Sequence, residues 1–581
     1  MSKNWKLKPK APEELLEQNV QYSLLLTQLL YNRGLTEKAE IETFLHPQYE
    51  AQYDPFLFQD MDKAVRRIWE ALEKNQGICI YGDYDADAVT ANAVLQQTFL
   101  YLGKKIDSYI PDRFTEGYGL NLQAFQKIRD QGAAVVITVD CGTNSVEVAD
   151  FCKQNNIDLI ITDHHEIIGP KPKAFALINP KNSNDKYPYQ EITGVGVAFK
   201  LAKAILSRQE KVAATLKTIH GEEFAYVPGF EKWLLDLVAI GTVADCHSLL
   251  GENRILVTYG LKVLQKTRWP GLRALIHAAQ LNFSEKLPDT YTLGFILAPR
   301  LNAAGRLEHA DTALHLLLEQ DPTDAATRAN NLEKINIRRQ EQTLRIVSEA
   351  KAQAELISDR KVIIVAGEGW NKGIVGLVAG RLVEEYHKPV MVLEKGAVES
   401  TGSARTVGEF DVVESLKHAS EYLLRFGGHK QAAGLTLKTA HFEVFYSKIL
   451  EYAEINLTEE DLLRELTLDA QLTADDLNAE TFSAIAAMEP FGVGNPKPKF
   501  LLSGTEIISM RWVGKQNQHL QMKLKAGEKT IDSIMFSASD FAKNLKIGDT
   551  IDVACELVED TWNGSKNLKL RLVDLRIAQV S

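Results

Sequence analysis

The sequence predicts a multidomain α/β protein with a parallel sheet, a long connecting helix, a second α/β domain and a C-terminal β-barrel. Short apolar runs alternate with helical segments from about residue 60, which is typical of a parallel sheet buried on both faces. The chain has 581 residues, more than the ~250–300 that one hydrophobic core accommodates. Short strand-like segments after residue 465 have the spacing of a small barrel such as an OB-fold.

Changes in pattern along the chain predict five segments. A helix start is clearest at Asp321-Pro322, where an N-cap acid precedes a proline in the first turn. Residues 190–320 are predicted to be mostly helical. The predicted segments are an N-terminal helical segment (1–55), a first α/β domain (56–320), a connector helix (321–358), a second α/β domain (359–458) and a barrel domain (459–581).

Composition narrows the class of protein. The net charge is −11, which argues against a non-specific nucleic-acid coat, so an anionic polymer needs one local basic channel. No apolar run approaches the ~18 residues of a membrane-spanning helix, and no apolar signal core follows the N-terminus. Five cysteines occur without a C-x-x-C pair. We therefore expect a cytoplasmic protein with neither a disulfide framework nor a zinc knuckle.

Acidic and imidazole side chains follow three of the predicted strands. The apolar runs Ile78–Tyr81, Val135–Val139 and Leu159–Thr162 each end in such a cluster. Ligands of a parallel α/β sheet bind beyond the carboxyl ends of its strands, so the clusters are expected to meet at one edge. The clustered residues are Asp83, Asp85, Asp87, Asp140, Asp163, His164 and His165.

Carboxylates gathered this closely repel one another unless a cation neutralises them. Oxygen ligands with one or two imidazoles favour Mn²⁺ or Mg²⁺ over structural zinc, and two ions ~3.5–4 Å apart would suit attack on a phosphate ester. An EF-hand would need glycine and glutamate where Ala88 and Val94 stand. Asp245 is the last residue of the apolar segment 237–245. It is either a metal ligand or a plain helix-terminal acid, and both interpretations stay open.

At this point the sequence resembles a known family. Gly-Asp-Tyr-Asp-Ala-Asp (82–87), Val-Asp-Cys-Gly (139–142), Asp-His-His (163–165) and Ala-Asp (244–245) resemble the four motifs of the DHH phosphoesterases. Segments 110–119, 251–254 and 299–306 are similar to RecJ signatures. Segments 402–405 and 427–434 resemble the DHH-associated domain, and Pro-Phe-Gly-Val-Gly-Asn-Pro (490–496) resembles the RecJ element before its OB-fold. The chain is thus identified as a member of the RecJ-type exonucleases.

The resemblance implies a DHH catalytic domain, a DHH-associated domain and an OB-like barrel. RecJ enzymes degrade single-stranded DNA from the 5′ end by two-metal catalysis and release mononucleotides. The resemblance assigns His165, Asp140 and Asp163 to catalysis. It assigns two Mn²⁺ or Mg²⁺ ions to Asp83, Asp85, Asp87, Asp140, His164 and Asp245.

The family pattern also implies a substrate path. A terminal-phosphate anchor is expected from Arg113, Ser403 and Arg405, because arginine forks onto phosphate. Arg300 and Arg306 are candidates for backbone-phosphate contacts and Asn302 for a polar contact. Tyr118 either stacks on a base or packs in the core. Gly428 and His429 are expected to present an amide and an imidazole to the cleft.

Two other functions compete with this interpretation. Another DHH phosphodiesterase, acting on a small nucleotide, would need no strand-binding barrel, and a RecJ relative acting on RNA is a further alternative. A catalytically inactive single-strand-binding scaffold would have no reason to keep every expected ligand. We expect a monomer that acts in DNA repair and recombination with a single-strand-binding protein and a helicase. The chain departs from the family pattern at Ala88, Asn371 and the Cys-His-Ser segment 246–248, where His247 has no assigned role.

Overall fold

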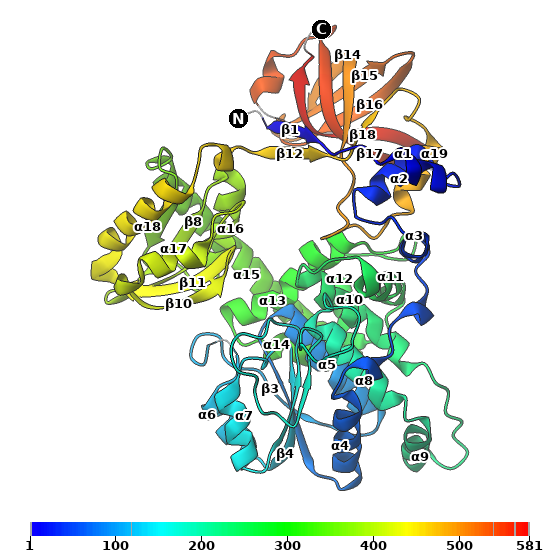
Figure 1. Ribbon diagram of the computed structural model, residues 1–581, viewed down its shortest axis with the longest axis vertical. Coiled ribbons are helices and arrows are strands. Elements are labelled where there is room, and N and C mark those ends of the chain that lie inside the picture. Colours follow the sequence, from blue (N-terminus) through cyan, green and yellow to red (C-terminus); the bar gives the residue numbers. More distant parts are fainter. Residues whose placement is uncertain (1–2, 118, 539, 563–564, 579–581) are drawn as a thin grey trace. The chain divides into compact units, whose positions relative to one another are not determined.

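The computed structural model describes residues 3–117, 119–538, 540–562 and 565–578 (Figure 1). The chain divides into two compact units. One contains Tyr53–His247 and Leu256–Leu463, and the other contains Met1–Gln52, Ser248–Ile255 and Arg464–Ser581. Among the described residues, no helix has the length and apolar character needed to cross a membrane.

The first unit is built around a five-stranded sheet whose neighbouring strands are all parallel. The strands, in spatial order, are β3 (Asp107–Tyr109), β2 (Gly77–Gly82), β4 (Ala133–Val139), β5 (Asp158–Thr162) and β6 (Ala176–Ile178). The residues of the central strands are almost all buried because helices cover both faces. This confirms the parallel sheet predicted from the continuous apolar runs.

Helices on both faces bury the sheet. On one face lie α6 (Leu122–Asp130) and α7 (Val146–Gln154) (Figure 1). Their side chains Phe125, Ile128 and Val148 pack against residues of β2, β4 and β5. The opposite face carries α4 (Met61–Glu73), α5 (Ala86–Tyr101) and α8 (Gly194–Leu206). The mostly helical region that follows is also as predicted. It consists of α9 (Gln209–His220), α10 (Leu235–Ala244), α11 (Gly251–Leu264), α12 (Pro270–Ala278), α13 (Ala298–Leu307) and α14 (Asp311–Leu318).

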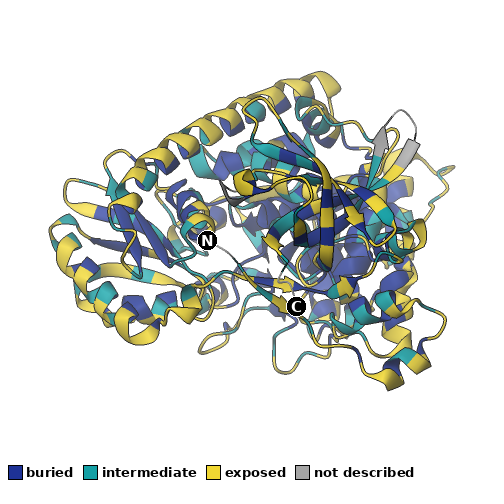
Figure 2. Ribbon diagram, turned by 90° about the horizontal axis from the view of Figure 1, so that it is seen from above, coloured by how far each residue is buried: buried dark blue, intermediate teal, exposed yellow. Residues whose placement is uncertain are grey.

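The predicted connector is a single helix, α15 (Pro322–Glu355), whose N-cap Asp321 accepts hydrogen bonds from two backbone N–H groups of the first turn. It leads to a mixed five-stranded sheet in the order β10-β11-β9-β8-β7. Figure 2 shows that buried residues concentrate in the strands and on inward helix faces. The elements of this domain are β7 (Ile363–Gly367), α16 (Val375–Tyr386), β8 (Val390–Lys395), β9 (Glu399–Arg405), α17 (Val412–His418), β10 (Leu423–His429), β11 (Ala432–Lys438) and α18 (Phe442–Asn456).

The second unit contains a closed β-barrel. The order β14-β15-β16-β18-β17 is closed by pairing of β17 with β14, as in an OB-like barrel. This confirms the predicted fold class. The barrel strands are β14 (Phe500–Val513), β15 (His519–Ala526), β16 (Lys529–Met535), β17 (Thr550–Trp562) and β18 (Ser565–Ile577), with β13 (Ala470–Leu472) beside β14.

The N-terminal segment packs in the same unit as the barrel. Its helices α1 (Glu13–Gln18), α2 (Leu24–Tyr31) and α3 (Lys38–Leu45) fit the prediction of a helical segment, and α2 and α3 contribute to the barrel core. A strand that was not predicted, β1 (Asn4–Leu7), pairs in parallel with β12 (Glu465–Leu468). Four residues carry no usable periodicity, and the partner strand is remote in sequence, so the sequence offered no signal for β1.

Candidate active site

The site lies at the carboxyl ends of β2, β4 and β5, where the three acidic motifs were expected to meet. The chain continues from β2 to β3 on one side and later returns to β4 on the other, so this edge is a topological switch point. Asp140 follows β4 directly in a left-handed conformation, with φ 60°. Its N–H donates to the carbonyl of Thr162 at 2.9 Å. A non-glycine residue held in this region is a local strain of the kind that collects at functional sites.

Asp163 positions both histidines that follow it. Its Oδ1 accepts hydrogen bonds from His165 Nδ1 at 2.7 Å and from the His164 N–H at 2.7 Å. Its Oδ2 accepts from the Thr143 N–H at 2.9 Å. Burial alone would raise the pKa of this carboxyl, but the hydrogen bonds and charge of His165 lower it below the ordinary value. Burial likewise opposes protonation of His165, yet its hydrogen bond to Asp163 raises the pKa of His165.

The other acids form a buried, mutually repelling group. Burial first, and then the neighbouring Asp85, raise the pKa of Asp83 to about 8 and that of Asp245 to about 7. Burial and nearby carboxylates also raise the pKa values of Asp87 and Asp140 well above the ordinary value. The cause of these shifts is that several carboxylates share a poorly solvated space, in which a cation is electrostatically favoured.

The donor atoms at this edge fit a divalent metal. His164 Nε2 lies 3.0 Å from Asp140 Oδ1 and 3.6 Å from Asp245 Oδ2. Asp140 Oδ1 and His164 Nδ1 are buried and have no hydrogen-bond partner among the described residues. Two groups of potential ligands overlap at His164, one with Asp140, Asp163 and His165 and one with Asp245 and His247. Oxygen with some imidazole is the donor set that Mn²⁺ accepts.

The acids of the first motif are tied to the backbone. Asp85 is the N-cap of α5 and accepts from the Ala88 N–H at 3.0 Å. Asp87 accepts from the Gly194 and Val195 N–H groups at 2.9 and 3.0 Å, so the first turn of α8 holds it. Their assignment as metal ligands stays a prediction. Ala88 lies inside α5, where alanine is favourable, so this departure from the family pattern introduces no backbone strain.

Two glycines make room for the acids, and neither was predicted from the sequence. A side chain at Gly194 would overlap the carboxylate of Asp140, and one at Gly241 would overlap Asp87 and Thr90. Gly194 opens α8 after the N-cap Thr193, whose hydroxyl accepts from the Gly196 N–H. A Thr-Gly-x-Gly segment at a helix start is a signal for a close approach of this kind.

A cluster of guanidinium groups lies beside the acids. Burial lowers the pKa of Arg306 to about 9, and the charges of Arg113 and Arg405 add to this effect, whereas Asp85 opposes it. Arg113 lies over the ring of Tyr84 at 4.8 Å. Arg405 donates to Ser403 Oγ at 2.9 Å. Within the described part of the chain, none of these three guanidinium groups forms an ion pair with a carboxylate. Their unneutralised charge suits an anion such as phosphate.

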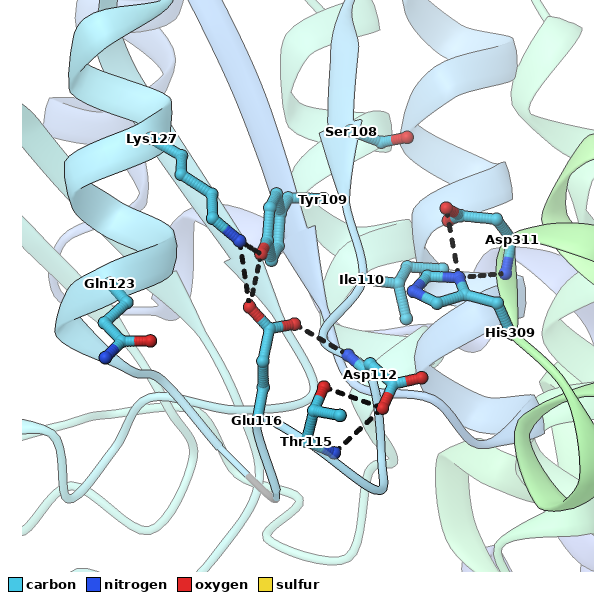
Figure 3. Close-up of a pocket in the computed structure, with 10 residues that line it drawn as sticks. All are labelled: Ser108, Tyr109, Ile110, Asp112, Thr115, Glu116, Gln123, Lys127, His309 and Asp311. Atoms are coloured by element: carbon cyan, nitrogen blue, oxygen red, sulfur yellow. Dashed lines mark hydrogen bonds and ion pairs between the residues drawn. The ribbon is translucent and has the colours of Figure 1, made fainter.

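The loop that carries Arg113 is held by its own polar network. Asp112 Oδ1 accepts from the Phe114 and Thr115 N–H groups at 3.0 and 2.8 Å. Glu116 accepts from the Tyr109 hydroxyl at 2.6 Å and the Asp112 N–H at 2.8 Å. These side chains line a cavity of about 480 Å³, and Figure 3 shows them paired with one another. We interpret the side chains that line this cavity as support for the loop.

The remaining predicted substrate residues differ in their surroundings. Asn302 Oδ1 accepts from the Ala86 N–H at 2.9 Å, so it supports the start of α5. Arg300 forms a two-pronged ion pair with Glu333 at 2.6 and 3.1 Å. Gly428 and His429 are exposed at the end of β10. Tyr118 lies outside the described residues. Contacts of these residues with substrate stay predictions.

Comparison with known proteins agrees with this geometry. Residues 77–242 match the DHH family, N-terminal domain, residues 359–454 match the DHHA1 domain, and residues 468–574 match the RecJ OB domain. The single-stranded-DNA-specific exonuclease RecJ of Bacillus subtilis (strain 168) is 37% identical over 97% of this chain and 69% of its own length.

Solved structures agree as well. The crystal structure of RecJ in complex with Mn²⁺ from Thermus thermophilus matches with a TM-score of 0.83 and 28% identity, over 99% of this chain and 80% of that chain. The Mg²⁺ complex from the same organism matches with a TM-score of 0.77 and 27% identity, over 99% and 79% of the two chains. This chain belongs to the RecJ family of single-stranded-DNA-specific exonucleases.

Proposed function

We propose that this protein is a metal-dependent exonuclease that hydrolyses single-stranded DNA from the 5′ end and releases 5′-mononucleotides. The observation that carries the proposal is the pairing of two charged clusters in one unit. Buried carboxylates and imidazoles lie at the strand ends, and Arg113, Arg306 and Arg405 lie beside them without a carboxylate partner among the described residues. The first cluster suits a metal-assisted phosphodiesterase and the second suits the phosphate of a substrate.

The residues Asp140, His164 and Asp245 would hold metal, together with Asp83, Asp85 and Asp87 on the same edge. When bound, Mn²⁺ or Mg²⁺ neutralises the carboxylates, polarises the phosphate ester and lowers the pKa of an attacking water. The buried atoms Asp140 Oδ1 and His164 Nδ1, which have no hydrogen-bond partner among the described residues, support this assignment. So do the metal complexes of the Thermus thermophilus RecJ.

His165 is the proposed catalytic imidazole. Its Nδ1 is hydrogen-bonded to Asp163, so its Nε2 is the nitrogen that can donate to a phosphate oxygen. Because Asp163 raises the pKa of His165, the ring favours the form that carries a proton on both nitrogens. A donor fixed in this way stabilises negative charge that develops on the phosphate in the transition state. Asp163 acts through His165 and is therefore a positioning residue.

The guanidinium cluster is the proposed anchor for the terminal phosphate. Arg405 and Ser403 come from β9, whereas Arg113 comes from the loop after β3, so two domains of the same unit supply the anchor. An anchor that engages a phosphate at a strand end favours exonucleolytic over internal cleavage. The 5′ polarity rests on the resemblance to RecJ enzymes.

The barrel is the proposed holding site for the strand. Residues 468–574 match the RecJ OB domain, and OB-folds bind single strands by stacking and backbone charge. We also propose a monomer in the cytoplasm that cooperates with a single-strand-binding protein and a helicase in repair and recombination. The proposal of these partners rests on the family resemblance.

Product analysis tests the proposal. A 5′-labelled and a 3′-labelled single-stranded oligonucleotide would be digested in Mn²⁺, in Mg²⁺ and in EDTA, beside a matched duplex. Labelled mononucleotide is expected at once from the 5′-labelled strand, with metal dependence and little cutting of blunt duplex. Asp140→Asn is the control, because asparagine tolerates the left-handed backbone. Tight strand binding without cleavage in either metal would instead support a scaffold.

A further inference from the structure

His247 lies in the metal site although no motif assigned it a role. The helix α10 ends at Ala244, and Cys246 adopts a left-handed conformation with φ 56°. This turn directs the chain back, so that His247 Nε2 lies 3.2 Å from Asp245 Oδ2. The rings of His247 and His164 are 4.8 Å apart between centroids.

The hydrogen bonding of His247 leaves one nitrogen for a cation. Its Nδ1 lies 3.1 Å from the carbonyl oxygen of Glu191. A carbonyl can only accept, so Nδ1 carries the proton and Nε2 of the neutral ring carries a lone pair. That lone pair faces Asp245 Oδ2, which is also an acceptor. A metal ion between these two atoms would remove the repulsion between their lone pairs. A metal-binding histidine usually donates the hydrogen on its other ring nitrogen to an acceptor such as a backbone carbonyl, as Nδ1 does here.

The distances are close to those expected within a single coordination shell. Neighbouring ligands on one ion, each ~2.1 Å from it, are roughly 3.0–3.4 Å apart in octahedral or tetrahedral arrangements. Asp245 Oδ2 lies 3.2 Å from His247 Nε2, which is within this range, and 3.6 Å from His164 Nε2, which is slightly longer. One ligand atom from each of the three residues lies within 4.8 Å of the others.

We propose that His247 supplies a second imidazole nitrogen to the metal position formed by His164 and Asp245, and that this position therefore prefers Mn²⁺ to Mg²⁺. The inference rests on the proposed metal-dependent function. Mg²⁺ prefers oxygen ligands and keeps much of its water, whereas Mn²⁺ accepts imidazole more readily. An ion pair of a doubly protonated His247 with Asp245 is the competing explanation, and it predicts no contact between His247 and the metal.

Metal binding without DNA tests the proposal. Mn²⁺ would be titrated into wild type, His247→Val and His247→Asp, with free Mn²⁺ followed by electron paramagnetic resonance. Nitrogen coupling to the bound ion would be read by electron spin echo modulation. His315→Gln on the exposed face of α14 is the matched control. For His247→Val we expect Mn²⁺ affinity to fall on the order of 10–100-fold, with one nitrogen coupling lost. Mg²⁺ affinity, measured by competition, should change far less.

The His247→Asp variant and the wild-type protein make the outcome decisive. His247→Asp replaces nitrogen with oxygen, so it is expected to restore binding and move the preference towards Mg²⁺. Unchanged Mn²⁺ affinity and unchanged nitrogen coupling in His247→Val would overturn the inference and leave the proposed function intact. Failure of the wild-type protein to bind Mn²⁺ would instead overturn the metal site itself.

Discussion

Asp163 Oδ1 accepts a hydrogen bond from His165 Nδ1 at 2.7 Å, so the acid of the Asp-His-His motif orients the second histidine of the same motif. Asp163 is almost fully buried and also accepts hydrogen bonds from backbone N–H groups. Its carboxylate is therefore well occupied by hydrogen bonds within the protein. This arrangement gives Asp163 the position of an orienting acid, next to the two histidines for which metal binding and a contact with the substrate are proposed.

Asp163→Asn is predicted to lower kcat with little change in KM. The amide keeps the shape of the side chain but removes the charge that favours protonated His165. Loss of an orienting carboxylate of this kind costs roughly 10²–10⁴-fold in rate. Steady-state kinetics on a single-stranded oligonucleotide would measure it, with Mn²⁺ affinity as the control readout. A rise in KM at constant kcat would contradict the positioning role.

Gly194→Ala is predicted to abolish activity by displacing Asp140, because the new methyl group would overlap its carboxylate. Gly380→Ala is the matched control. Gly380 lies in α16 with nothing within 4 Å of an added Cβ, so this change should stabilise the helix by about 0.5–1 kcal/mol. Activity, Mn²⁺ affinity and melting temperature would be compared. Full Mn²⁺ affinity in Gly194→Ala would contradict the prediction.

The sequence predicted the strand-end acids because parallel strands direct their carboxyl ends to one edge, whatever the details of packing. The same logic is sufficient to identify Asp140, Asp163 and His164 from sequence alone. Gly194 and His247 were not predicted, because their roles depend on how α8 and α10 meet the sheet edge. Contacts between segments distant in sequence leave no local periodicity.

Because contacts between distant segments leave no local pattern, the N-terminal strand was also not predicted. For the same reason, the structural contacts of two predicted substrate residues were not foreseen. Asn302 bonds to Ala86 and Arg300 pairs with Glu333. A sequence motif shows that a polar side chain is present but not which neighbour it meets. The family resemblance supplied the anchor set Arg113, Ser403 and Arg405, and local chemistry alone would have left these as ordinary surface residues.

Arg254→Met is predicted to destabilise the barrel-containing unit. The buried guanidinium donates to the carbonyl groups of Phe44, Glu489 and Pro490 and lies 3.8 Å from the Phe44 ring centroid. Losing these bonds leaves buried acceptors unpaired, at about 3–5 kcal/mol in total. Urea unfolding would measure the change, with Arg66→Met as the control in an exposed ion pair. A loss below about 1 kcal/mol would show that Arg254 is dispensable.

Asp236→Asn is predicted to change how stability depends on pH. Burial raises the pKa of Asp236 to about 6, so the protonated acid stabilises the folded protein below pH ~4 and that contribution is lost as pH rises through about 6. The amide cannot ionise. The variant should therefore gain up to about 3 kcal/mol over wild type between pH 4 and pH 7. Asp150→Asn on the exposed surface of α7 is the control. Parallel curves for wild type and Asp236→Asn would refute the prediction.

Arg405→Gln is predicted to weaken recognition of a terminal phosphate. The guanidinium is half-buried, donates to Ser403 and has no carboxylate partner among the residues the structure describes. Glutamine removes the charge and the fork, so KM for 5′-phosphorylated DNA should rise roughly 10–100-fold, as expected for loss of a charged bond of about 1.5–3 kcal/mol. KM for 5′-hydroxyl DNA should change much less. Arg338→Gln, which alters a surface ion pair with Glu308, is the control. Equal losses on both substrates would show that Arg405 contacts the strand elsewhere, because an anchor for the terminal phosphate must distinguish the two ends.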